Sequence, residues 1–184
     1  GSFNSNKVWI VNGVSNKIDG NFIPTKFAFN EIGQTGISIG PYPEYEIDYE
    51  TLHKKGIKVI INLMTDDELA YRQIKLEQVQ HYCEKLQMKF VRIPLNDYAD
   101  DQYSFDLISA AKELCKNSKS KVYLHCASGV SRAPTLALVY MCLFKKIDQW
   151  QNVFSCLNYL QSYCKETAPN MKMVQQVIEK NHAF

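Results

Sequence analysis

The chain has 184 residues, with 21 Lys and Arg against 19 Asp and Glu, and 46% of its residues are hydrophobic. This length suits one domain with a well-buried core, and a near balance of charge without a basic block gives no support for binding nucleic acid. No apolar run reaches the length of a membrane span and no signal peptide is visible, so we expect no membrane span.

The first third of the chain predicts short strands before a helix. Short apolar runs at 8–11 and 37–39 are typical of edge or opening strands, whereas residues 15–30 show no clear period and are expected to be loop. Residues 45–55 have a helical pattern that stops at Gly56, a residue suited to a C-terminal cap.

A β-branched run at 57–63 follows and predicts a buried central strand. Thr65 and Glu68 then have the spacing of a capping box, so a helix-rich segment should run from there towards Gln87. Residues 88–93 predict the next strand.

The rest of the chain alternates between the same two kinds of element. A helix with one apolar face is expected at 104–116, and a strand at 122–124. Three further helices are expected at 134–144, 148–163 and 169–181. The alternation predicts an α/β fold in which helices flank a central mixed sheet, with an N-terminal segment at 1–30 that contains an edge strand and one compact domain at 31–184.

The most informative motif follows the strand at 122–124, and it reads His125-Cys126-Ala127-Ser128-Gly129-Val130-Ser131-Arg132. Inward backbone N–H groups and the positive end of the next helix would make a cradle for an anion, which Arg132 can close with its planar fork. The same field stabilises a thiolate, so Cys126 is a candidate nucleophile. The candidate phosphate-binding residues are Ala127, Ser128, Gly129, Val130, Ser131 and Arg132.

The six cysteines are scattered along the sequence. They form no Cys-x-x-Cys pair, so we expect neither a metal site nor a disulfide framework, and the motif requires no cofactor. A required thiolate fits a reducing compartment, which favours the cytoplasm or nucleus. An organelle stays open, because a targeting segment can lie outside this sequence.

The motif resembles the signature of the cysteine-based protein phosphatases, and its context is similar to the dual-specificity branch from about Ile37 to about Ile178. The resemblance implies a dual-specificity phosphatase-like catalytic domain at 31–184. It also implies hydrolysis of phosphotyrosine and phosphoserine or phosphothreonine in proteins, through a phosphocysteine intermediate on Cys126.

A carboxylic acid must protonate the leaving oxygen, and the candidates lie in the loop at 94–101. Asp97 occupies the position that matches the family's general acid, and Asp100 and Asp101 are rivals because spacing alone does not decide which carboxyl reaches the site. His125 is expected to support the loop by a hydrogen bond rather than to take part in catalysis.

One residue departs from the family pattern. Many members carry Ser or Thr directly after the arginine, where the hydroxyl bonds the thiolate, and this chain has Ala133. Loss of a donor to a charged sulfur costs about 1.5–3 kcal/mol where nothing replaces it. We therefore expect slow hydrolysis of the phosphocysteine, unless Ser131 or water compensates.

Three classes of function stay open at this stage. A protein phosphatase is the first, and the uncharged rim of the loop disfavours inositol lipids. A phosphatase of phosphorylated glucan is the second, because Arg132-Ala133-Pro134 and the run 61–71 are similar to plant-type glucan phosphatases. A catalytically weak phosphate-binding module is the third. Aromatic residues that could stack on sugars are Tyr42, Tyr45, Tyr71, Tyr98, Tyr103 and Trp150.

Overall fold

The computed structural model describes residues 27–96, 101–145, 147, 150–181 and 183–184, and the backbone of four short strands between residues 10 and 22. For residues 101–105 it likewise describes the backbone alone. No helix in this described part of the chain is both long and apolar enough to cross a membrane.

A five-stranded mixed sheet forms the centre of the domain. Its strands in spatial order are β5 (Asn30–Glu31), β6 (Ile37–Gly40), β9 (Val122–His125), β7 (Val59–Asn62) and β8 (Lys89–Arg92). β5 pairs antiparallel with β6, and all other neighbours are parallel. The predicted α/β fold with a mixed sheet is therefore confirmed, and β9, which leads into the motif, is its middle strand.

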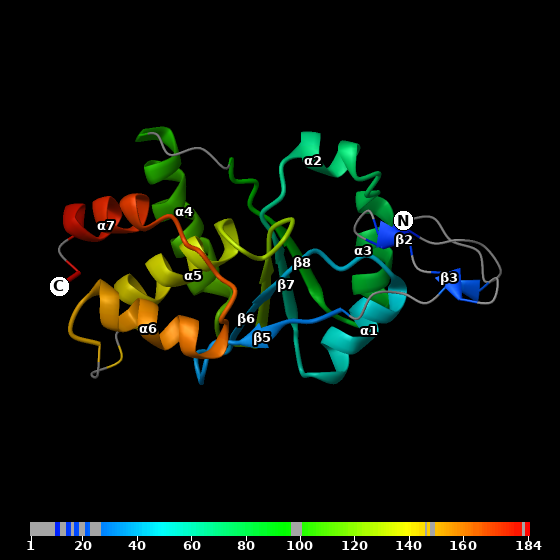
Figure 1. Ribbon diagram of the computed structural model, residues 1–184, viewed down its shortest axis with the longest axis horizontal. Coiled ribbons are helices and arrows are strands. Elements are labelled where there is room, and N and C mark those ends of the chain that lie inside the picture. The colour runs from blue at the N-terminus through cyan, green and yellow to red at the C-terminus, as the bar shows by residue number, and fades with distance from the viewer. Residues whose placement is uncertain are drawn as a thin grey trace.

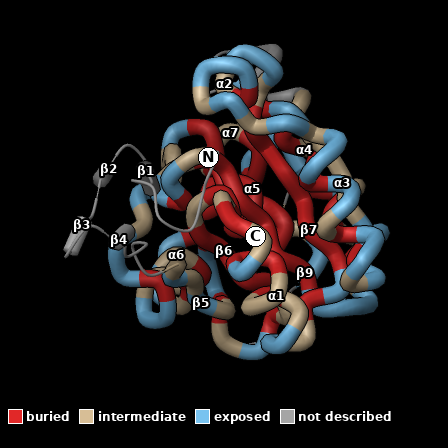
Figure 2. Tube along the Cα trace, turned by 90° about the vertical axis from the view of Figure 1, so that its right-hand side faces the viewer, coloured by how far each residue is buried: buried red, intermediate tan, exposed pale blue. Residues whose placement is uncertain are grey.

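Helices cover both faces of the sheet (Figure 1). One face carries α1 (Glu46–Lys54) and α3 (Leu76–Lys85), and the other carries α4 (Asp101–Asn117), α5 (Arg132–Tyr140), α6 (Val153–Tyr163) and α7 (Met171–Lys180). The short helix α2 (Asp66–Tyr71) lies beyond the end of β7. Figure 2 shows α5 and the inner strands as the buried centre of the molecule.

The alternation of side chains along β7 explains why its first three residues, Val59, Ile60 and Ile61, are all apolar. Val59 and Ile61 pack into the core beneath α4–α7, whereas Ile60 packs into the second core beneath α1 and α3. A strand covered on both faces has no solvated side, so both sets of alternating side chains are apolar here until the strand ends at Asn62, whose Oδ1 accepts a hydrogen bond from the N–H of Met64.

The predicted helix at 45–55 and the strands at 57–63, 88–93 and 122–124 are confirmed within one or two residues. The segment at 66–87 is helical in two pieces, α2 and α3, and Thr65 caps α2 as its spacing predicts. Four helix starts differ from the prediction. α4 begins at Asp101 and α5 at Arg132, both earlier than expected, whereas α6 begins only at Val153 and α7 at Met171. Asn152 sets the start of α6, because its side-chain oxygen accepts hydrogen bonds from the N–H groups of Phe154 and Ser155.

The prediction of a loop over 15–30 was wrong in part. β1 (Ile10–Val11) pairs with β2 (Val14–Ser15), and β3 (Lys17–Ile18) pairs with β4 (Asn21–Phe22). β1 lies within the strand predicted at 8–11, but strands of two residues are too short to show a period, so the pattern did not reveal β2, β3 and β4. A π-helical turn, η1 (Met141–Lys145), extends α5. The division of the chain at residue 30 stays a prediction.

Candidate active site

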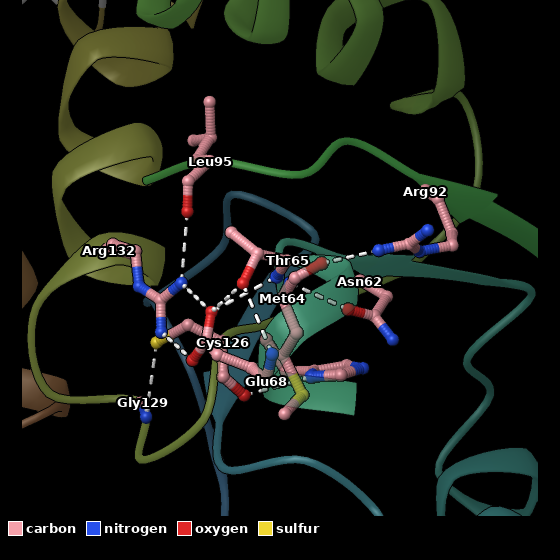
Figure 3. Close-up of polar contacts among 10 residues, drawn as sticks. Asn62, Met64, Thr65, Glu68, Arg92, Leu95, Cys126, Gly129 and Arg132 are labelled. Carbon is pink, nitrogen blue, oxygen red and sulfur yellow. Dashed lines mark hydrogen bonds and ion pairs between the residues drawn. The ribbon is translucent and has the colours of Figure 1, made fainter. Parts of the chain in front are cut away.

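The motif forms the loop between β9 and α5, at the carboxyl end of the parallel strands. Cys126 follows β9 directly, is 2% exposed, and its Sγ accepts a hydrogen bond of 3.3 Å from the backbone N–H of Gly129 (Figure 3). Arg132 is the first residue of α5, so the nucleophile candidate lies at the positive end of a helix. A backbone donor and a helix N-terminus both favour a negative charge at this sulfur.

The loop needs glycine at position 129 for two reasons. Gly129 has φ +80°, a conformation that other residues rarely adopt. A Cβ at this position would lie 2.5–2.8 Å from backbone atoms of Gly40, at the end of β6. The loop therefore packs directly on the backbone of the sheet, which fixes its distance from the strands.

Arg132 is held by a bidentate ion pair with Glu68. Its Nη1 and Nη2 each donate to one carboxylate oxygen at 2.6 Å, and Nη1 also donates to the carbonyl oxygen of Leu95 at 3.0 Å (Figure 3). The Arg132 side chain is 8% exposed and that of Glu68 is 28% exposed. A planar guanidinium gripped at one edge has its orientation fixed for a second partner.

Glu68 is a site residue that the sequence interpretation missed. Burial raises the pKa of this carboxyl, but the hydrogen bonds from Arg132 and from the N–H of Thr65, with the charge of Arg132, outweigh burial and lower the pKa to about 2. The group is therefore a carboxylate at neutral pH. Its capping-box spacing revealed the bond to Thr65, but no local signal shows that α2 starts beside α5.

His125 supports the loop from beneath. It is 2% exposed, its ring stacks on that of Tyr123 with centroids 5.7 Å apart, and its Nδ1 lies 3.0 Å from the carbonyl oxygen of Cys126. Since a carbonyl oxygen only accepts, Nδ1 carries the proton. Burial lowers the pKa of His125 to about 4, the bond to the Cys126 carbonyl opposes this, and the charge of Arg132 adds to the lowering. The ring is therefore neutral at pH 7.

The segment between α6 and α7 is fastened to the same loop. The N–H of Ala168 donates to the carbonyl of Val130 at 2.7 Å. The Thr135 hydroxyl donates to the Ser131 carbonyl at 2.7 Å and accepts from the N–H of Asn170 at 2.8 Å. The Thr135 hydroxyl is thus engaged by backbone groups.

Ala133 is fully buried at the second position of α5, and a methyl group offers no donor to the sulfur. Ser131 is bonded through its carbonyl in the described residues, since both the hydroxyl and the N–H of Thr135 donate to it. Compensation for the missing hydroxyl by Ser131 stays a prediction.

Most of the loop that carries the candidate acids lies outside the described residues. Asp97 and Asp100 lie outside the described residues, and of Asp101 only the backbone, at the start of α4, is described. The loop that carries them starts beside the site, because the carbonyl of Leu95 bonds Arg132. Asp97 as the general acid stays a prediction.

The aromatic residues singled out for sugars divide clearly. Tyr42, Tyr45 and Trp150 are buried and cannot present a face to a ligand, whereas Tyr71 is 85% exposed. Tyr98 is outside the described residues, and the side chain of Tyr103 is not described. All six cysteines are free thiols, and the described residues contain no cluster of side chains suited to a metal ion.

Comparisons with known proteins agree with this geometry. The family model described as "Dual specificity phosphatase, catalytic domain" matches residues 39–183. Tyrosine-protein phosphatase vhp-1 of Caenorhabditis elegans is 27% identical over 135 residues, which make up 72% of this chain and 18% of that protein. Dual specificity protein phosphatase Mpk3 of Drosophila melanogaster is 22% identical over 136 residues, which make up 73% of this chain and 29% of that protein. The chain thus spans less than a third of the length of these relatives.

Solved structures share the fold. The human tyrosine phosphatase-like serine/threonine/tyrosine-interacting protein superposes with a TM-score of 0.65 at 18% identity, covering 84% of this chain and 95% of the other. A kinase associated phosphatase with its catalytic-site cysteine replaced by serine also gives 0.65, at 15% identity, covering 88% and 98%. The family model matches most of the chain, residues 39–183. The chain therefore belongs to the dual-specificity phosphatase catalytic-domain family, a class of cysteine-dependent phosphatases.

Proposed function

We propose that this chain removes phosphate from phosphotyrosine and from phosphoserine or phosphothreonine in proteins, through a phosphocysteine on Cys126. The observation that carries the proposal is the contact between the Cys126 sulfur and the Gly129 N–H, at the start of the helix whose first residue is Arg132. One loop thus offers a nucleophile and an anion-binding cradle together.

The first step is transfer of the phosphoryl group to sulfur. The backbone of residues 127–131 and the guanidinium of Arg132 hold the phosphate oxygens, and Glu68 keeps the guanidinium in place. The Cys126 thiolate attacks phosphorus, so an S–P bond forms while the bond from phosphorus to the leaving oxygen breaks. Asp97 gives its proton to that oxygen.

The second step returns the free enzyme. The Asp97 carboxylate takes a proton from water, the water oxygen attacks phosphorus, and the S–P bond breaks to release inorganic phosphate and the thiolate. Arg132 stays bound to the equatorial oxygens in both steps. Ala133 gives the departing thiolate no hydroxyl, so we expect this step to limit turnover.

A side-by-side assay tests the proposal. Purified protein is given a phosphotyrosine peptide, a phosphothreonine peptide, phosphorylated glucan and p-nitrophenyl phosphate, with Cys126→Ser as the inactive control. We expect release of phosphate from both peptides by the unsubstituted protein and from none of the substrates by Cys126→Ser. Preference for phosphorylated glucan over both peptides would replace the proposal with the glucan phosphatase, which the sequence Arg132-Ala133-Pro134 favours. Phosphate binding without hydrolysis of any substrate would indicate a binding module.

A further inference from the structure

A groove of about 430 Å³ opens beside the phosphate loop. One wall is the edge of the sheet at 28–30 and 39–41, the second is the outer side of the loop at 128–130, and the third is the segment at 163–167. The first and third walls lie side by side where β5 meets the end of α6, and the thiol of Cys164 lies 3.8 Å from the carbonyl of Asn30 (Figure 1). The volume is within the range of ~300–1,000 Å³ that is typical of ligand pockets.

The groove and the phosphate site share one loop. Ser128, Gly129 and Val130 form both the wall of the groove and part of the cradle around Cys126. The hydrogen bond from the Ala168 N–H to the Val130 carbonyl fixes the third wall to the same loop. Neither Cys126 nor Arg132 lines the groove, so it lies next to the cradle rather than within it, where a residue that flanks the phosphorylated one would bind.

The residues that line the groove favour an apolar side chain carried on a polypeptide backbone. Among the described lining residues, two large apolar side chains are exposed, Val130 at 41% and Tyr163 at 47%. Exposed apolar side chains that gather in a groove are typical of binding sites. Lys165 and Glu166 are adjacent and opposite in charge, which gives no preference for a second phosphate or an acidic group. Their polar atoms, with those of Asn30 and Thr167, can bond peptide N–H and carbonyl groups.

We infer that this groove binds a large apolar side chain next to the phosphorylated residue of a polypeptide substrate, with Tyr163 and Val130 as its apolar contacts. The inference rests on the proposed protein phosphatase activity and narrows its substrate class. Tyr163 is the residue that tests it, because it lies outside the phosphate loop.

The experiment compares three phosphotyrosine peptides that differ only beside the phosphorylated residue: leucine before it, leucine after it, or serine on both sides. The groove lies on one side of the phosphate loop, so one of the two leucine peptides should place its leucine there. That peptide should have a kcat/KM about tenfold above that of the serine peptide, since burying part of a leucine side chain gives about this gain. Tyr163→Ala should lose this preference, and Tyr163→Phe, which keeps the ring, should retain it. Tyr71→Ala removes an exposed tyrosine outside the groove and is the matched control. Turnover of p-nitrophenyl phosphate should be unchanged in all three variants.

Equal kcat/KM for the three peptides in the unsubstituted protein would overturn the inference without any variant. A preference that survives in Tyr163→Ala would equally overturn the role of the groove. A loss in Tyr163→Ala of activity on phosphorylated glucan, with peptide kinetics unchanged, would assign the groove to a sugar instead. If p-nitrophenyl phosphate is hydrolysed and none of the peptides is, the proposed protein substrate fails, which is a different result from the loss of a preference.

Discussion

In the proposed mechanism, Arg132 binds a dianionic phosphate while it is already paired with a carboxylate. The ion pair with Glu68 uses both Nη1 and Nη2, and the bond to Leu95 uses a further N–H of Nη1, so three of its N–H donors serve to orient the group. A phosphate bound at Cys126 thus meets a guanidinium whose orientation these bonds fix. Glu68 therefore offsets part of the positive charge of Arg132 and at the same time holds the guanidinium in one orientation.

Glu68→Gln tests this role. An amide keeps the shape of the side chain but loses the charge and one of the two acceptors, so Arg132 is held less firmly. We expect kcat/KM on a phosphopeptide to fall by about tenfold or more, which corresponds to ~1.4 kcal/mol or more of transition-state stabilisation. Steady-state kinetics measure it. Asp67→Asn, an exposed neighbour on α2, should leave kinetics unchanged, and unaltered kinetics in Glu68→Gln would refute the positioning role.

Asp97→Ala tests the acid. An alkyl leaving group needs a proton as it departs, whereas an acidic phenol leaves without one. We therefore expect kcat to fall by about 10²-fold or more on a phosphothreonine peptide and by far less on p-nitrophenyl phosphate. Asp100→Ala is the matched variant and should change neither rate. The reverse result for the two variants would move the role to Asp100.

At the scale of elements, the catalytic loop is shaped by its contact with the sheet as much as by its own sequence. Gly129→Ala would place a Cβ within 2.8 Å of the Gly40 backbone, and neither backbone can yield without moving β6 or Cys126. We expect loss of phosphatase activity together with a clear fall in the free energy of unfolding, measured by denaturant titration.

Gly36→Ala is the control for this substitution. Gly36 has φ +79°, so alanine suffers the same backbone strain of about 1–2 kcal/mol, but its Cβ would meet nothing within 4 Å. Activity should therefore survive in Gly36→Ala. Retention of activity in both variants would show that the close approach of Gly129 and Gly40 is not needed by the site.

Some of the elements and site residues could be predicted from the sequence, and others could not. The strand at 57–63 and the apolar face of α4 were predictable, because their patterns are local and long enough to show a period. Of the hairpins within residues 10–22, only β1 was predictable, because each strand has two residues. The local spacing of the motif predicted Cys126 and Arg132 as candidate site residues, and both lie on the loop between β9 and α5. The pairing of Glu68 with Arg132 could not be predicted, because the two residues lie 64 positions apart and only the packing of α2 against the loop brings them together.

At the scale of the whole molecule, His125 links stability to pH. Its folded pKa of about 4 lies below the ordinary value of 6.5, so the unfolded chain binds a proton in this interval while the folded chain does not. The contribution of His125 to the free energy of unfolding should therefore be complete above pH 6.5 and decrease as the pH falls towards 4. Denaturant titrations across this range measure it. His125→Gln should be less stable at pH 7 but show a flatter dependence, and identical slopes for both proteins would contradict a buried neutral histidine.

The account as a whole depends on a covalent bond between phosphorus and the Cys126 sulfur. We expect Ala133 to slow its hydrolysis, so the intermediate should accumulate after rapid mixing with an activated aryl phosphate. Acid quenching on the time scale of one turnover, followed by mass spectrometry of the peptide that contains Cys126, measures it directly. We predict one added phosphoryl group on Cys126, an initial burst of the phenol, and a smaller burst in Ala133→Ser. Cys126→Ser should give neither signal. Turnover in Cys126→Ser, or a phosphoryl group on another residue of an active enzyme, would contradict the account.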